Sequence, residues 1–111
     1  MNTVKYNKLI RDKIPEIIEA SGKSCSVQVL SDADYITYLD KKLEEELAEY
    51  QADKSMEELA DLLEVVYSVA EAKGCSVEQL ESIRLEKAEK RGRFTKKLCL
   101  KEVSSHAETV E

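Results

Sequence analysis

The sequence predicts an all-α protein in which a helical hairpin forms part of a bundle of about four helices, completed by oligomerisation. Apolar residues recur at helical spacing through most of the 111-residue chain. Trp is absent and there is one Phe and one Pro, so the core must consist mainly of aliphatic side chains, as in helix packing. A chain of this length forms one domain with a modest core, and we place that domain at residues 1–101.

The N-terminal part predicts a short helix and allows one minor β pair. Residues 6–20 place apolar side chains at helical spacing, and Pro15 in their middle should break the helix, which ends before Gly22. Residues 24–30 alternate polar with apolar side chains and predict a short strand, for which residues 96–100 are the partner.

Two long helices should follow and form an antiparallel hairpin. Ser31 is an N-cap candidate before a periodic run that reaches Tyr50, and Ser55 precedes a second run that ends at Gly74. We take residues 51–54 as the connection, which is short enough to hold the two helices side by side.

The helix that follows Ser55 is apolar on more than one side. Its apolar face is centred on Leu59, Leu63, Val66 and Ala70 and widened by Leu62, Val65, Val69, Ala60 and Tyr67. A chain this short can hardly cover such a helix by itself, so we expect it to pack against a second copy. This predicts an obligate homo-oligomer, with dimer and tetramer both open.

The C-terminal part predicts a last helix and a tail. Residues 76–91 open with a capping signal and continue in a helical pattern. Residues 102–111 contain too few apolar side chains to pack, and we expect them to be disordered. They include His106, the single histidine, which removes Ser–His and Cys–His catalysis from consideration.

The composition excludes several classes of protein. The net charge is −6 and no block of Lys or Arg is present, which argues against nucleic acid as a partner. Three widely spaced cysteines without a C-x-x-C pair are typical of reduced thiols. No apolar run approaches the roughly 20 residues that span a bilayer, and the N-terminus has no signal-peptide core. We therefore expect a cytoplasmic protein with no membrane partner.

Carboxylates are arranged symmetrically about the predicted hairpin connection. With its centre at 53.5, Glu49 and Glu58 are equidistant from the turn, and so are Glu46 and Asp61. Residues three apart lie one turn on along a helix, so four carboxylates would point into one space between the helices. A hard divalent cation such as Mg²⁺ or Mn²⁺, which prefers oxygen ligands, would relieve their repulsion.

Two ordinary readings stand beside this metal site. Glu-rich helices are common on protein surfaces, so the carboxylates would then form a solvated face. Ser55 and Glu58 also match a capping box, in which the glutamate bonds back to the N-cap amide. Spacing alone leaves these alternatives open.

Several motifs resemble those of one enzyme superfamily. K-L-x-E-E-x-x-E at residues 42–49, followed by E-L-A-D at 58–61, resembles the signature of the MazG-like all-α nucleoside triphosphate pyrophosphohydrolases. That superfamily includes phosphoribosyl-ATP pyrophosphohydrolase and the dimeric dUTPases. Y-N-K-L-I-R-D-K-I-P at 6–15 is similar to a phosphoribosyl-ATP pyrophosphohydrolase-like branch, and K-x-x-x-R-G-x-F at 87–94 completes the likeness.

The resemblance implies hydrolysis of the α–β phosphoanhydride of a nucleotide, releasing a monophosphate and pyrophosphate. By position, Glu46, Glu49, Glu58 and Asp61 would hold Mg²⁺. Glu45 would be an extra ligand, or would orient or deprotonate the attacking water, and we assign catalysis to Glu45 and Glu46. The number of metal ions stays open.

Basic residues are candidates for binding phosphate. Lys87 and Arg91 stand at i, i+4, and their ordinary role would be surface salt bridges. Lys8, Arg11 and Lys13 form a second group, whose ordinary role would be to dock the N-terminal segment on the acidic hairpin. The tyrosines of the long helices fit packing better than stacking on a base.

The sequence thus predicts a nucleotide pyrophosphohydrolase that clears unwanted nucleotides from the pool. Phosphoribosyl-ATP hydrolysis in histidine biosynthesis is the alternative within the enzyme class. A non-catalytic, nucleotide-binding or regulatory helical dimer is the alternative outside it. Base and sugar preference depend on side chains that the sequence does not place.

Overall fold

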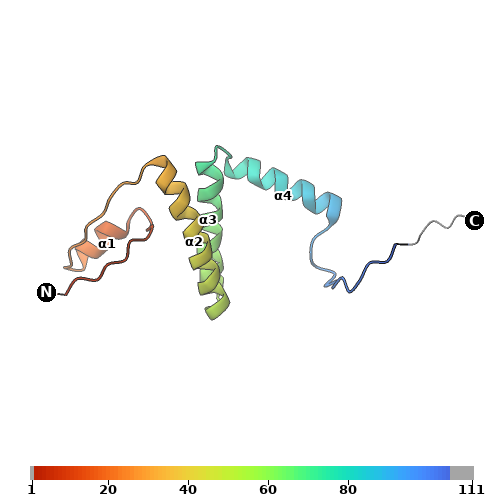
Figure 1. Ribbon diagram of the computed structural model, residues 1–111, viewed down its shortest axis with the longest axis horizontal. Helices are drawn as coiled ribbons and strands as arrows, with labels where there is room; N and C mark the ends of the chain where they lie inside the picture. Colours follow the sequence, from red (N-terminus) through yellow and green to blue (C-terminus); the bar gives the residue numbers. More distant parts are fainter. Residues whose placement is uncertain (1, 106–111) are drawn as a thin grey trace, which may run out of the picture. The chain divides into compact units, whose positions relative to one another are not determined.

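The computed structural model describes residues 2–105, and the described part of the chain is all-α, as predicted. Its helices are α1 (Ile14–Ala20), α2 (Asp32–Asp53), α3 (Met56–Ala72) and α4 (Val77–Arg91), shown in Figure 1. The predicted strands at 24–30 and 96–100 are wrong, because both segments lack regular structure. Both segments are short, and two short strands do not form a stable sheet without further strands or a helix packed against them.

Contacts divide the chain into two compact units, residues 1–80 and residues 81–111. The first unit holds α1, the α2–α3 hairpin and the start of α4. The second holds the rest of α4 and the residues that follow it, where Phe94, Leu98 and Leu100 are exposed. Residues 102–105 have no regular structure, and the remainder of the predicted tail, with His106, lies outside the described residues.

The helices α2 and α3 lie side by side and run in opposite directions (Figure 1). Only Lys54 and Ser55 connect them, so the predicted connection at 51–54 was placed too early, and residues 51–53 are still helical. The turn is this tight because Lys54 adopts the left-handed conformation, with φ of 59°, and its N–H donates to the Tyr50 carbonyl at 2.7 Å.

Both long helices begin where the sequence predicts. The Ser31 hydroxyl accepts a hydrogen bond from the Asp34 N–H, and the Ser55 hydroxyl accepts one from the Glu58 N–H, each at 3.2 Å. Such a cap satisfies one of the amides that an α-helix leaves unpaired in its first turn. The α3 helix ends in a Schellman motif, in which Gly74 has φ of 84° and the Cys75 N–H donates to the Ala70 carbonyl.

The first helix is shorter than predicted. α1 begins at Ile14, so Pro15 lies in its first turn and does not break a longer helix. Proline suits that position because its missing N–H would have no partner there and its fixed φ is already helical. Residues 6–13 are not part of a helix, and they cross the hairpin as an irregular segment tied to it by side chains.

The core of the described chain is small. Leu39 of α2 and Val65 of α3 are its buried hydrophobic residues, with exposed fractions of 2% and 8%. Leu59 and Leu63, at the predicted centre of the apolar face of α3, are 40% and 47% exposed. Within one chain, α2 therefore covers the Val65 side of α3 and leaves the centre of that face open. None of the described helices is both long enough and apolar enough to cross a membrane.

Candidate metal centre

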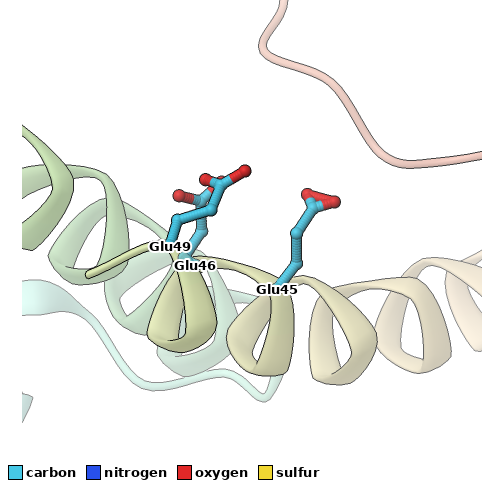
Figure 2. Close-up of side chains that lie close together, drawn as sticks. All are labelled: Glu45, Glu46 and Glu49. Atoms are coloured by element: carbon cyan, nitrogen blue, oxygen red, sulfur yellow. The ribbon is translucent and has the colours of Figure 1, made fainter. Parts of the chain in front are cut away.

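Five carboxylates come together on the hairpin, with Glu46 at their centre. Ligand atoms of Glu45, Glu46 and Glu49 lie within 4.8 Å of one another, and so do those of Glu46, Glu58 and Asp61. Figure 2 shows that the three α2 side chains project from the same side of the helix, with Glu46 and Glu49 close together. Glu46 belongs to both groups and joins the α2 carboxylates to those of α3.

The spacing of these residues explains the arrangement. Glu46 and Glu49 are three apart on α2, and Glu58 and Asp61 are three apart on α3, so each pair presents carboxylates from adjacent turns. The short connection then holds the two pairs against each other. The structure therefore brings together every carboxylate that the sequence nominated for the site.

Burial distinguishes this cluster from an ordinary acidic surface. Glu46 is 7% exposed, and its Oε2 is buried without a hydrogen-bond partner among the described residues. Oε2 of Glu58 is likewise a buried atom without a hydrogen-bond partner among the described residues, although Glu58 as a whole is only half-buried. A buried carboxylate oxygen with no partner costs free energy, whereas a solvated acidic surface has no such cost.

The capping-box alternative accounts for the backbone N–H of Glu58 but not for its carboxylate. Its N–H donates to Ser55, but its Oε2 is one of the unpartnered oxygens. At the start of α4 the same motif is complete, because the Ser76 N–H donates to Gln79 Oε1 at 2.8 Å and the Gln79 N–H donates to Ser76 Oγ at 3.1 Å. The Glu58 carboxylate is therefore left available to the cluster.

Electrostatics agree with the geometry. Burial raises the pKa of Glu46, and the neighbouring carboxylate of Glu49 raises it further, against the opposing charge of Lys42. Burial also raises the pKa of Glu58, together with the charges of Glu49, Asp61 and Asp53. Both carboxyl groups are harder to ionise than usual because the cluster holds too little positive charge.

Two cations partly compensate the cluster. Lys42 Nζ lies 2.6 Å from Glu45 Oε2 and 3.5 Å from Glu46 Oε1. Burial lowers the pKa of Lys42, but its contacts with Glu45 and Glu46 raise it above the ordinary value on balance. Arg11 Nη2 lies 2.7 Å from Asp61 Oδ1. Five carboxylates against two cations leave an excess of three negative charges when all are ionised.

The other predicted basic residues lie elsewhere. Arg11 reaches the cluster, as the docking role predicts, whereas Lys13 is an exposed residue at the N-cap of α1. Lys8 lines a cavity beside Glu45. Lys87 and Arg91 are exposed on α4, in the second unit, and the ion pair with Glu86 is made there by Lys90 at 3.7 Å.

Sequence reasoning included Lys42 in a motif but gave it no role in the cluster, although its spacing could have indicated one. Lys42 stands three and four residues before Glu45 and Glu46, the separations at which opposite charges meet on a helix. The partner of Arg11 had no such signal, because 50 residues separate it from Asp61.

Comparison with known proteins assigns no activity. No family profile matches the chain, and no solved structure matches it. A segment of 45 residues is 51% identical to an uncharacterized protein of Mycolicibacterium smegmatis and covers 40% of this chain. The chain spans 46% of the length of that curated relative, or about half.

The residues of the cluster fit a hard divalent cation. All five donors are carboxylate oxygens, which suit Mg²⁺ and Mn²⁺ and do not favour zinc or copper. Two of their oxygens are buried and unpartnered, and the excess charge is negative. The candidate functional site is therefore a carboxylate centre between α2 and α3.

Proposed function

We propose that this protein is a Mg²⁺-dependent nucleotide pyrophosphohydrolase that cleaves the α–β phosphoanhydride of a nucleoside triphosphate or a related nucleotide. The observation that carries the proposal is the buried, partly unpartnered Glu46 facing Glu58 and Asp61 across the hairpin. The sequence motifs that resemble those of the MazG-like enzymes include these same residues. Removal of unwanted nucleotides in the cytoplasm is the role that we assign to the activity.

Glu46, Glu49, Glu58 and Asp61 would hold Mg²⁺ or Mn²⁺. When bound, the ion withdraws charge from phosphoryl oxygens and makes coordinated water more acidic. The protein supplies a fixed set of oxygens for it, since both pairs come from regular helices and not from loops. It also supplies partial burial, which strengthens electrostatic interactions with a substrate phosphate.

Glu45 is the residue that we assign to the attacking water. It lies on the same side of α2 as Glu46 and Glu49 (Figure 2), and Lys42 holds its carboxylate at 2.6 Å. In the proposed reaction the water oxygen bonds to the α-phosphorus and the bond to the bridging oxygen breaks. Pyrophosphate leaves, and the water proton passes to Glu45 or to solvent.

A second copy of the chain would complete the fold. The open centre of the α3 face forms a shallow apolar groove lined by Met56, Leu59, Ala60, Leu62, Leu63 and Val66. Leu59 and Leu63 are 40% and 47% exposed in this groove, and an apolar face left open on a helix is a candidate interaction site. The same face from another copy would match it in apolarity, giving a symmetric interface between α3 helices.

The test of the activity is pyrophosphate release from a panel of ribo- and deoxyribonucleoside triphosphates, modified nucleotides and phosphoribosyl-ATP, with and without Mg²⁺. We expect metal-dependent turnover that falls at least about 100-fold in Glu58→Gln. Glu81→Gln, an exposed glutamate of α4, is the matched control and should turn over normally. Turnover of phosphoribosyl-ATP and of no other substrate would favour the alternative activity, phosphoribosyl-ATP hydrolysis in histidine biosynthesis. No turnover by a folded, metal-binding protein would favour a non-catalytic nucleotide binder.

Sedimentation measures the assembly. The native chain should be a dimer or tetramer, and Leu63→Glu should shift it toward the monomer because a charge would enter the apolar face. Val29→Glu is the control, since Val29 is 95% exposed and lies outside the groove. A monomeric native protein would contradict the proposal that a second copy covers the apolar groove of α3.

A further inference from the structure

A small cavity lies between the N-terminal segment and α2, beside the carboxylate cluster. Its volume is about 140 Å³. Residues 7–9 form one wall, and Tyr38, Lys41, Lys42 and Glu45 of α2 form the other. Glu45 belongs both to the cavity and to the metal centre, so the two adjoin.

The cavity is positively charged in a protein of net charge −6. Lys8, Lys41 and Lys42 line it against the single carboxylate of Glu45. Lys42 is committed to Glu45 and Glu46, whereas Lys8 and Lys41 take no part in the salt bridges of residues 2–105. Their ammonium groups lie instead over aromatic rings, each 5.4 Å from a ring centroid. Since a ring leaves the hydrogen-bond donors of an ammonium group unused, both can still bind an anion.

The segment that closes the cavity is tied to the hairpin by an ion pair on its C-terminal side. The ion pair of Arg11 with Asp61 ties it to α3, close to residues 7–9. Asn7 has φ of 47°, a left-handed conformation that asparagine tolerates better than most residues. The cavity is thus made from two parts of the chain that the sequence alone does not bring together.

We infer that this cavity is the subsite for the pyrophosphate portion of the substrate, the β- and γ-phosphates of a nucleoside triphosphate. Lysine ammonium groups are common ligands of phosphate, and a diphosphate carries enough negative charge to occupy several of them. A volume of about 140 Å³ is below that of sites for whole drug-sized ligands, so it suits a diphosphate and not a complete nucleotide. The inference rests on the proposed function, because it places the cleaved bond at the adjoining carboxylates.

The test is calorimetric binding of inorganic pyrophosphate to the full-length protein at saturating Mn²⁺. Lys8→Gln and Lys41→Gln should each weaken pyrophosphate binding about tenfold or more, as expected for loss of a charged hydrogen bond. Lys23→Gln is the control, because it removes the same charge from an exposed loop of the same unit. Binding of a nucleoside monophosphate should be unchanged in all three variants.

Different outcomes separate the subsite from the proposed function. Unchanged pyrophosphate binding in both Lys8→Gln and Lys41→Gln would overturn the subsite, as would an equal loss in Lys23→Gln, which would indicate only general charge attraction. A loss confined to the nucleoside monophosphate would overturn the assignment to the pyrophosphate portion. Mn²⁺ binding is titrated separately in each variant. If Mn²⁺ does not bind but pyrophosphate still depends on Lys8 and Lys41, the proposed function falls and the anion subsite stands.

Discussion

Two glutamates with similar local surroundings behave in opposite ways. Glu46 of α2 is four residues from Lys42, and Glu81 of α4 is three residues from Arg84, so each has a cation one turn away. The hydrogen bond to Arg84 lowers the pKa of Glu81, whereas burial and Glu49 raise the pKa of Glu46. Lys42 lies nearer to Glu45 than to Glu46, and α3 adds further negative charge. Tertiary packing, and not helical spacing, therefore decides which glutamate can belong to a metal centre.

The largest expected contrast between the two glutamates is in metal affinity. Glu46 belongs to both groups of three carboxylates. Glu46→Gln removes its charge from each, so Mn²⁺ affinity should fall at least about 100-fold. Glu81→Gln should leave it unchanged. Titration calorimetry with Mn²⁺ measures both, and equal affinities for native protein and Glu46→Gln would remove Glu46 from the centre.

Stability without metal should move in the opposite direction from metal affinity. In the presence of a chelator, Glu46→Gln should stabilise the fold by on the order of 1 kcal/mol, because a neutral amide of the same shape relieves repulsion and can donate to Glu49. Urea denaturation of chelated protein measures this. Destabilisation by Glu46→Gln would mean that the buried charge is already satisfied within the chain.

The pH dependence of stability should differ in sign between the two sites. The folded-state pKa values of Glu46 and Glu58 lie above the ordinary value of 4.5, so the folded protein binds more protons than the unfolded chain just above that pH. Their contribution therefore becomes more favourable as pH falls from neutrality toward 4.5. Glu81 contributes stability above 4.5 that is lost as pH falls through its lowered pKa.

Chelated protein should consequently be more stable near pH 5 than near pH 7.5, as measured by urea midpoints at the two values. The difference should shrink in Glu46→Gln. A midpoint that falls steadily on acidification, in native protein and variant alike, would contradict the assignment of raised pKa values to the cluster.

The smallest expected effect belongs to Glu81. Its ion pair with Arg84 is exposed, so Glu81→Gln should lower the urea midpoint at pH 7 only slightly, by less than Glu46→Gln raises it in chelator. High salt should erase most of the change, because an exposed pair is screened. A large loss of stability that persists at high salt would show that Glu81 has a structural role beyond this pair.

Local signals predicted the hairpin and its carboxylates well. Ser31 and Ser55 mark helix starts through a cap that involves only neighbouring residues, and the three-residue spacing of the glutamates survives small errors in the turn. The connection proved to be Lys54 and Ser55, and the same carboxylates still meet. The apolar periodicity of residues 6–20 predicted a first helix that is too long. Periodicity does not show that Pro15 lies in the first turn of a helix beginning at Ile14.

Contacts between distant parts of the chain escaped prediction. The ion pair of Arg11 with Asp61 and the cavity beside Lys41 depend on how residues 7–9 cross α2, which no spacing rule specifies. Identification of Val65, and not Leu63, as the buried residue of α3 likewise depended on the packing angle of the hairpin. Sequence spacing located the carboxylates, whereas the cations around them required the fold.

The left-handed turn at Lys54 sets the rotational phase of α3 relative to α2. One residue added between Lys54 and Ser55 would lengthen this tight turn and allow α3 to pack in another rotational position, in which Glu58 and Asp61 point away from Glu46 while every helix keeps its own hydrogen bonds. Such a chain would retain its helical content and lose its shared carboxylate centre. The length of this connection is therefore constrained by chemistry more than by folding, and insertions in the non-helical residues 23–30 should be better tolerated.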